Sequence, residues 1–370
     1  MRHVRRFSSL SALCNQIKHN GPITVADFMR QSLRHPLHGY YSSRTKDIGS
    51  DFVTSPQVSS FLGEILGVWS CLAWKAMGQP SKFHFIELGP GSGLLAKDYV
   101  SSFAHISKLP LSNISMSLVE ISNNLKLIQK SNLSSIIEDI CWFDSLNNIP
   151  NDLPTLVIAH EFFDALPVHV FKKVNGQWAE LLVDIASFED NQLNFVQSQV
   201  SSVPKACLPP LDCSRDHIEV CLEGASKIEI LAKRAHQQKH ACLIVDYGHN
   251  GDEQDTLRGY FNNRQVNILE HFGSCDVTAD VDFSFLSKHG EDNGLSILGP
   301  IEQGHFLLNL GIDLRLKNSL ALQRNSDKRN ALLNAFKMLV GPSNMGSRFK
   351  VMCLSSPELI LHEDFSSAFK

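Results

Sequence analysis

The sequence has no excess of basic residues. Its 370 residues include 34 lysines and arginines against 38 aspartates and glutamates, which gives a formal net charge of −4. Proteins that bind DNA or RNA neutralise backbone phosphates with clustered lysines and arginines, so we do not expect nucleic acid as a partner. Long apolar runs are missing too. None reaches the roughly 18 to 20 residues that a membrane-spanning helix needs, so we expect no membrane span.

The cysteines also lack a recognisable binding pattern. All nine are scattered, with no C-x-x-C pair and no paired Cys/His spacing of the kind that zinc sites use. The odd number suggests no disulfide framework and fits a reducing compartment. Acidic residues gather at Asp276, Asp280 and Asp282, but their spacing does not match a calcium loop. We interpret them as capping and turn residues, and the sequence predicts no metal site.

The first residues are poor in acidic side chains. Residues 1–9 contain Arg2, Arg5 and Arg6 together with serine, and the first acidic residue of the chain is Asp27. This composition is typical of a mitochondrial presequence, and a basic tail ahead of a helix is the alternative. We therefore expect a short presequence over residues 1–9 and a location in the mitochondrion.

Residues 10–80 are expected to form an N-terminal helical segment with a loop that covers a ligand. Thr24 is placed to N-cap a helix. Residues 47–56 are rich in glycine, serine, threonine and aspartate, and such a loop ahead of the first strand often folds over a bound ligand. Thr54 and Ser55 are candidate cofactor-binding residues in it. A plain connection between two helices is the alternative.

The chain is organised around residues 83–99, FHFIELGPGSGLLAKDY. A short apolar run ends in Glu87, and the glycines Gly89, Gly91 and Gly93 precede a second apolar segment, which predicts a strand, a tight turn and a helix start. Glycine permits a positive φ and lets a ligand lie against bare backbone, and the helix start offers unpaired N–H groups. A dinucleotide fingerprint would need a third glycine where Leu94 stands. The observed spacing instead looks like the first motif of S-adenosylmethionine methyltransferases, which disfavours a nicotinamide-dependent oxidoreductase.

Ionisable side chains follow three further apolar runs that we interpret as parallel strands. In open α/β sheets, ligands bind at the carboxyl edge of such strands, and a carboxylate there can accept both hydroxyls of a ribose. Solvation is the alternative for Glu120, and helix capping with solvation is the alternative for Glu161 and Asp164. The candidates are Glu120 after residues 114–119, Glu161 and Asp164 after residues 153–159, and Asp246 and His249 after residues 242–245.

These runs predict an α/β fold. Residues 81–370 are expected to form a Rossmann-like domain, with a helix over residues 219–236 and an inserted arm at about 186–215, where the sequence is polar and proline-bearing. The N-terminal helical segment would precede this domain.

Several stretches, in matching order over residues 11–352, together resemble one family. They are GPITVADFM, PLHGYY, DFVTSPQVSSFLGE, ELGPGSG, AHEFFDALPVHVF, DYGHNG, TLRGY, TADVDFSFL and MGSRFK. The resemblance is to the MidA-type proteins, the mitochondrial complex I assembly factors described as protein arginine methyltransferases. Ser92 departs from the arginine that this family usually has at that position, and a serine cannot supply a fixed cation.

The resemblance implies a class I methyltransferase sheet and S-adenosyl-L-methionine as cofactor. It implies a type II activity, the symmetric dimethylation of an arginine on the 49-kDa-type core subunit of complex I, which supports complex I assembly in the mitochondrial matrix. Glu87, the three glycines and Glu120 would then bind the cofactor. A non-catalytic assembly protein that keeps the fold and a methyltransferase acting on a small molecule stay as alternatives, and a homodimer stays open.

An arginine acceptor brings a chemical requirement. Its pKa of about 12.5–13.8 makes full deprotonation at pH 7 cost roughly 7.5–9 kcal/mol. Carboxylates that grip the guanidinium bidentately are a cheaper solution, because they localise its charge and free the lone pair of the remaining nitrogen. We expect Glu161 and Asp164 to make this grip. Asp246 and His249 are second candidates, with His249 able to relay a proton.

Overall fold

The computed structural model describes residues 2–42, 60–187, 189, 191–252 and 255–370. The chain divides into two compact units. The first comprises Met1–Phe52, Asp164–Ser226 and Gly251–Asp282, and the second comprises Val53–Phe163, Lys227–Asn250 and Phe283–Lys370. This division differs from the expected one, which placed boundaries near residue 80 and around an arm at 186–215, and those expected bounds stay a prediction.

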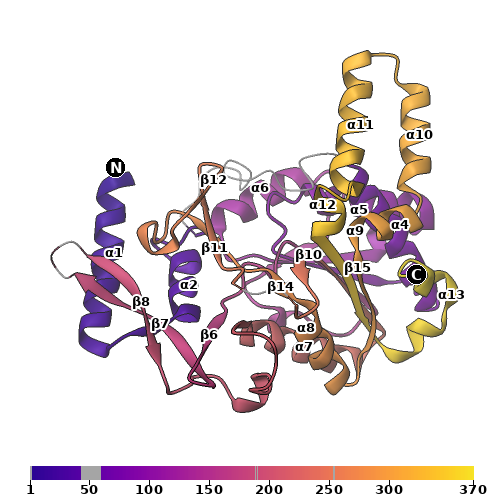
Figure 1. Cartoon of the computed structure of the whole chain (residues 1–370). Helices are drawn as coiled ribbons and strands as arrows, with labels where there is room; N and C mark the ends of the chain where they lie inside the picture. The colour runs from indigo at the N-terminus through magenta and orange to yellow at the C-terminus, as the bar shows by residue number, and fades with distance from the viewer. Residues whose placement is uncertain (1, 43–59, 188, 190, 253–254) are drawn as a thin grey trace. The chain divides into compact units, whose positions relative to one another are not determined.

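Helices and strands alternate from β2 (Phe83–Leu88) to β4 (Ile140–Phe143), whereas runs of strands and of helices follow later in the chain (Figure 1). The α-helices are α1 Arg2–Asn20, α2 Val25–Arg34, α4 Phe61–Ala76, α5 Leu94–Ser107, α6 Asn123–Leu133, α7 Leu222–Ala235, α8 Phe283–Asp292, α9 Gln303–Asn309, α10 Ile312–Leu322, α11 Ser326–Val340, α12 Met345–Arg348 and α13 Glu363–Ser367. The strands are β1 Ile23–Thr24, β2 Phe83–Leu88, β3 Ile114–Val119, β4 Ile140–Phe143, β5 Thr155–His160, β6 His169–Val174, β7 Gln177–Ser187, β8 Gln192–Ser198, β9 His217–Val220, β10 His240–His249, β11 Arg258–Phe261, β12 Arg264–Val266, β13 Asp276–Thr278, β14 Val281–Asp282, β15 Ser296–Glu302 and β16 Phe349–Ser355.

The second unit is built on a mostly parallel sheet with the strand order β15-β16-β10-β5-β2-β3-β4. The five strands from β10 to β4 are parallel, and β16 runs antiparallel to both β10 and β15. From β2 the chain moves outward through β3 and β4, then returns to the other side of β2 with β5 and β10. The order therefore reverses between β2 and β5, and in open α/β sheets ligands bind beside such a reversal. The predicted Rossmann-like α/β class is confirmed.

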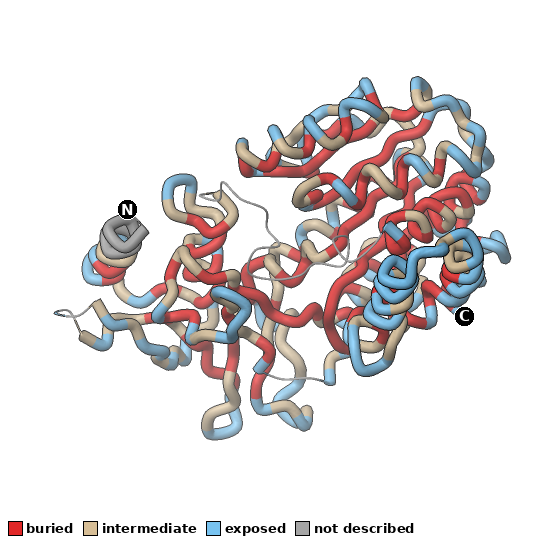
Figure 2. Tube along the Cα trace, turned by 90° about the horizontal axis from the view of Figure 1, so that it is seen from above, coloured by how far each residue is buried: buried red, intermediate tan, exposed pale blue. Residues whose placement is uncertain are grey.

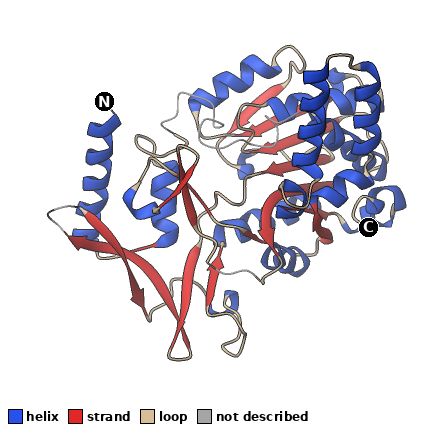
Figure 3. Ribbon diagram, turned by 45° about the horizontal axis from the view of Figure 1, so that its top comes forward, coloured by secondary structure: helices blue, strands red, loops and turns tan. Residues whose placement is uncertain are grey.

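The central strands of this sheet are buried because helices cover both faces (Figure 3). All six residues of β2 and all six of β5 are buried, which is typical of parallel strands that have no solvent-facing side. Figure 2 shows them as continuous buried stretches between helices that are exposed on their outer sides. Helices α4 and α5 share one core cluster with the strands, whereas α8 packs against β10, β15 and β16.

Aromatic rings fill the core between α5 and the sheet. Phe103 stacks on Phe83 with ring centroids 5.6 Å apart, and it meets Phe85 edge-on at 5.1 Å. Tyr99, one helical turn earlier, lies 5.4 Å from Phe85. Such pairs add to the free energy gained by burial, so α5 is held firmly against the strand that leads into the glycine turn.

Two long helices near the C-terminus, α10 and α11, lie side by side as a helical hairpin (Figure 1). Their exposed faces include apolar residues such as Leu314 and Leu322. Among the residues that the structure describes, no helix combines the length and the apolar character that a membrane crossing requires.

The first unit has a small antiparallel sheet, in which β7 pairs with β1, β6 and β8, and β6 also pairs with β9. A second antiparallel sheet contains β11, β12 and β13. Helix α2 begins where expected, because the Thr24 side chain accepts a hydrogen bond from the Asp27 N–H at 3.0 Å. Phe28 and Leu33 of this helix pack into one core with Val170 and Val183 of the sheet.

Three expectations about secondary structure were wrong. The strand expected over 242–245 is β10, which continues to His249 because β16 pairs with it as far as Tyr247. The segment expected as an irregular arm contains β8, whose backbone pairs with β7. The helix expected from Glu219 begins at Leu222, since Glu219 belongs to β9.

Candidate active site

The glycine turn joins β2 to α5 as the sequence predicts. Gly89, Gly91 and Gly93 have φ angles of +64°, +55° and +79°, a region that L side chains rarely adopt. A Cβ atom at Gly89 would also lie 2.9 Å from Cδ2 of Phe162. Gly93 is the N-cap of α5, so the turn presents bare backbone at the start of this helix.

Glu87 lies at the end of β2 and is almost fully buried, with 2% of its surface exposed. The Tyr99 hydroxyl donates a hydrogen bond to its Oε2 at 3.2 Å. Burial raises the pKa of Glu87 to about 8, although the hydrogen bond from Tyr99 acts in the opposite direction. The carboxyl group is therefore mainly protonated at neutral pH, and a cation placed beside it would favour its ionisation.

Glu120 directly follows β3 and is buried as well. The Ser122 N–H donates to its Oε1 at 2.7 Å, and the Gln129 amide donates to its Oε2 at 3.1 Å. Burial raises the pKa of this carboxyl group, whereas these hydrogen bonds lower it. A carboxylate has about four acceptor positions, so both oxygens retain capacity to accept the hydroxyls of a ribose.

Gln129 on α6 is a residue of this site that the sequence reasoning missed. Its Nε2 also donates to the Gly91 carbonyl at 2.8 Å, and its Oε1 accepts a hydrogen bond from the Trp142 indole at 2.8 Å. It lies four residues from each of two buried leucines, Leu125 and Leu133. A polar residue in the middle of an apolar helix face was the available signal.

Glu161 follows β5 at the point where the strand order reverses. Its φ of +48° is unusual for a residue with a side chain, and such strain clusters at functional sites. Its N–H donates to the Val245 carbonyl at 3.0 Å. The neighbouring His160 has its Nε2 3.7 Å from Glu161 Oε1, and burial lowers the pKa of His160 to about 3. The imidazole next to Glu161 is therefore neutral at physiological pH.

Asp246 is completely buried inside β10 rather than placed after it. Its Oδ2 accepts the N–H groups of Phe162 at 3.2 Å and Phe163 at 3.0 Å, and its Oδ1 accepts the Tyr247 N–H at 3.0 Å. These contacts join the carboxylate to the turn that carries Glu161. They favour a positioning role for Asp246. Its expected grip on a guanidinium stays a prediction.

The remaining candidates lie in different parts of the chain. His249 is the last residue of β10 and is buried. Asp164 belongs to the first unit, where its carbonyl accepts the Ala279 N–H at 3.0 Å. Thr54 and Ser55 lie outside the described residues. Of the expected acceptor-binding residues, the structure thus brings together Glu161 and Asp246 around one turn.

The sheet order, the glycine turn and the two buried carboxyl groups define a Rossmann-like methyltransferase. Residues 65–301 match the family model described as "Putative S-adenosyl-L-methionine-dependent methyltransferase". The chain belongs to this family. The resemblance seen in the sequence is confirmed, and the cofactor is S-adenosyl-L-methionine.

Relatives of known name are similar over nearly the whole chain. A Danio rerio protein is 38% identical over 364 residues, covering 93% of this chain and 86% of its own length. A Bos taurus protein is 39% identical over 368 residues, covering 93% and 82%. Both bear the name "Protein arginine methyltransferase NDUFAF7, mitochondrial". A Burkholderia thailandensis structure bound to S-adenosyl-homocysteine has the same fold, with a TM-score of 0.80, 23% identity, and coverage of 96% and 95%.

The raised pKa of Glu87 predicts a pH-dependent stability. The unfolded chain should lose this proton near the ordinary value of 4.5, whereas the folded protein holds it to about 8. The contribution of Glu87 to the free energy of unfolding is therefore full below about pH 4.5 and is lost as the pH rises through about 8. Glu87→Gln, which cannot ionise, should gain urea resistance relative to the wild type between pH 5 and pH 8.

Urea unfolding at several pH values measures this difference, and the exposed Glu138, changed to Gln, is the matched control. The Glu138→Gln profile should run parallel to that of the wild type. A Glu87→Gln profile that is also parallel would show that Glu87 ionises normally in the folded protein.

Proposed function

We propose that this chain transfers methyl groups from S-adenosyl-L-methionine to an arginine of a protein. The observation that supports S-adenosyl-L-methionine as the methyl donor is the glycine turn at the carboxyl edge of the sheet, with the buried Glu87 and Glu120 beside it. The name of the Danio rerio and Bos taurus relatives supports a protein arginine as the acceptor.

We further propose the methylated product and the location of the reaction. We infer a type II reaction that forms symmetric dimethylarginine on the 49-kDa-type core subunit of complex I and supports assembly of that complex. The location would be the mitochondrial matrix, after import directed by residues 1–9. The word "mitochondrial" in the names of the relatives and the arginine-rich start of the chain support this location.

The residues of the second unit fit the cofactor. Bound S-adenosyl-L-methionine would supply an electrophilic methyl group. Glu120 would accept the ribose hydroxyls, and the glycines between Gly89 and Gly93 would offer backbone without side chains to the ligand. Glu87 would face the ammonium group and ionise in response. Holding the reactants in line contributes about 7–11 kcal/mol to lowering a reaction barrier, so positioning is the main task of these residues.

For the acceptor, Glu161 is the carboxylate that we expect to grip the guanidinium. Its positive φ differs from the extended backbone of β5. Asp246 accepts hydrogen bonds from the N–H groups of the next two residues, Phe162 and Phe163, and holds them in place. Asp164 is proposed as the second carboxylate, and His249 as the residue that relays the proton. Two carboxylates on a guanidinium would localise its positive charge and leave one nitrogen as the nucleophile.

The cofactor assignment predicts the effect of Glu120→Ala. Removing two hydrogen bonds to a charged acceptor, each contributing about 1.5–3 kcal/mol, should weaken S-adenosyl-L-methionine binding by roughly a hundredfold or more. Isothermal titration calorimetry measures the affinity, and Glu138→Ala on the exposed surface should bind as the wild type does. Unchanged affinity in Glu120→Ala would contradict the assignment.

The acceptor assignment predicts that Glu161→Gln separates binding from chemistry. The amide keeps the shape of the side chain but cannot localise charge on the guanidinium, so methyl transfer should fall by two or more orders of magnitude, about the contribution of a positioned catalytic group. Cofactor affinity should stay unchanged. Incorporation of labelled methyl groups into the 49-kDa-type subunit measures the transfer. Full activity of the variant would show that another carboxylate grips the guanidinium. A wild type that binds the cofactor without transferring methyl groups would indicate a non-catalytic assembly protein.

A further inference from the structure

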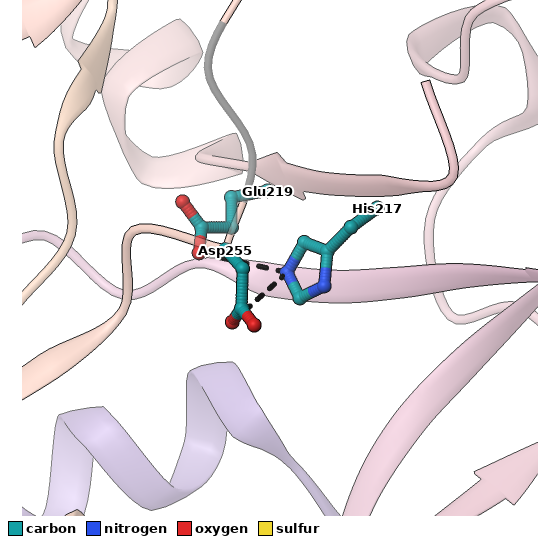
Figure 4. A group of neighbouring side chains, drawn as sticks. All are labelled: His217, Glu219 and Asp255. Atoms are coloured by element: carbon teal, nitrogen blue, oxygen red, sulfur yellow. Dashed lines mark ion pairs between the residues drawn. The ribbon is translucent and has the colours of Figure 1, made fainter. Parts of the chain in front are cut away.

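Three potential metal-binding side chains meet in the first unit, apart from the methyltransferase sheet. Strand β9 supplies His217 and Glu219, which are two residues apart and therefore project from the same face of the strand. Asp255, which precedes β11, supplies the third side chain. Figure 4 shows both carboxyl groups turned toward one nitrogen of the His217 ring.

The three side chains of this cluster lie at ion-pair distances that leave room for a shared ion. His217 Nε2 lies 3.7 Å from Glu219 Oε1 and 3.8 Å from Asp255 Oδ1, both longer than the roughly 3.2 Å limit of an N–H···O bond. One potential ligand atom from each residue lies within 4.8 Å of the others. A single point can therefore lie within about 2.8 Å of all three. Zinc bonds to imidazole and carboxylate are about 2.0–2.2 Å long, so closing the site needs movements of less than about 1 Å.

Neighbouring groups already fix the orientation of one carboxylate. The N–H groups of Thr256 and Leu257 each donate to Glu219 Oε1 at 2.9 Å, and the Thr256 hydroxyl donates to Oε2. Oε1 thus already accepts two hydrogen bonds, and the remaining acceptor position of Glu219 is on Oε2, where an ion would bind. Hydrogen bonds of this kind hold a ligand in its orientation. Asp255, next to them, has a φ of +55°, a strained conformation of the kind found at ligand clamps.

The cluster borders a cavity of about 260 Å³ that His217 and Asp255 help to line. Lys172 and Arg258 also line it, among apolar side chains that include Val170 and Leu181. A zinc ion with three protein ligands keeps a fourth position for water or another ligand. At this cluster, that position would face a space that Lys172 also lines, whereas Arg258 is paired with Asp280.

We propose that His217, Glu219 and Asp255 bind a divalent ion of the zinc type, with its exchangeable position directed to this cavity. One imidazole with two carboxylates is a donor set that zinc accepts, whereas magnesium and calcium prefer oxygen ligands alone. The site joins β9 to the segment before β11 and is independent of the proposed methyl transfer. It also goes beyond the sequence analysis, which predicted no metal site.

Titration of zinc chloride into the full chain, first stripped with a chelator, tests the site by calorimetry. The wild type should bind one zinc ion here, and Asp255→Asn should weaken this binding by at least about tenfold, since even an outer partner of a metal ligand is worth roughly 10–100-fold in affinity. The Asp255 side chain is 70% exposed, so this variant should fold. His217→Gln is the second variant.

His169→Gln is the matched control. His169 lies 2.8 Å from Glu180 in the same small sheet but belongs to no three-residue cluster among the described residues, so this variant should retain the zinc affinity. Absence of zinc binding by the wild type would overturn the proposal and identify the cluster as ion pairs. Equal affinity in the wild type, Asp255→Asn and His217→Gln would also overturn it, because the ion would then bind elsewhere, such as at the cysteine thiols.

Discussion

The side-chain amide of Gln129 joins the separate parts of the proposed cofactor site. It donates to the Gly91 carbonyl and to Glu120, and it accepts a hydrogen bond from Trp142. Because the residue is completely buried, losing any one of these bonds would leave a polar group without compensation, at about 1–3 kcal/mol each. One side chain on the crossover helix thus fixes the glycine turn relative to the carboxylate at the next strand, and the shape of the cofactor site depends on it.

The proposed acceptor site depends on another buried polar group. Asp246 uses a side-chain oxygen to hold the backbone after β5, where Glu161 has a strained conformation. A strained residue persists only when its surroundings hold it in place, and the buried Asp246 side chain contributes to this by accepting the N–H groups of Phe162 and Phe163. In both the proposed cofactor site and the proposed acceptor site, a fully buried side chain therefore anchors a short turn at the carboxyl edge of the sheet.

The parts predicted from the sequence are those encoded locally. Glycines that need positive φ and an apolar run before them were sufficient to place β2, its turn and α5, and the alternating pattern that ends before Glu120 placed the next strand. The contacts of Asp246 were not predicted, because Phe162 and Phe163 lie 83–84 residues away in the sequence. The contact of Gln129 with Gly91 was not predicted either, because these residues are 38 positions apart. Glu219 was assigned to a helix for the same reason, since its partners Thr256 and Leu257 are distant in sequence. Local patterns predict strand ends, but the use of a buried polar group depends on the tertiary structure.

The most direct test of the central claim is mass spectrometry of the 49-kDa-type complex I subunit from cells with and without this chain. The account predicts a symmetrically dimethylated arginine in cells that have the wild-type chain, and its loss both in cells lacking the chain and in those complemented with Glu120→Ala. The same extent of arginine methylation in cells lacking the chain would contradict it.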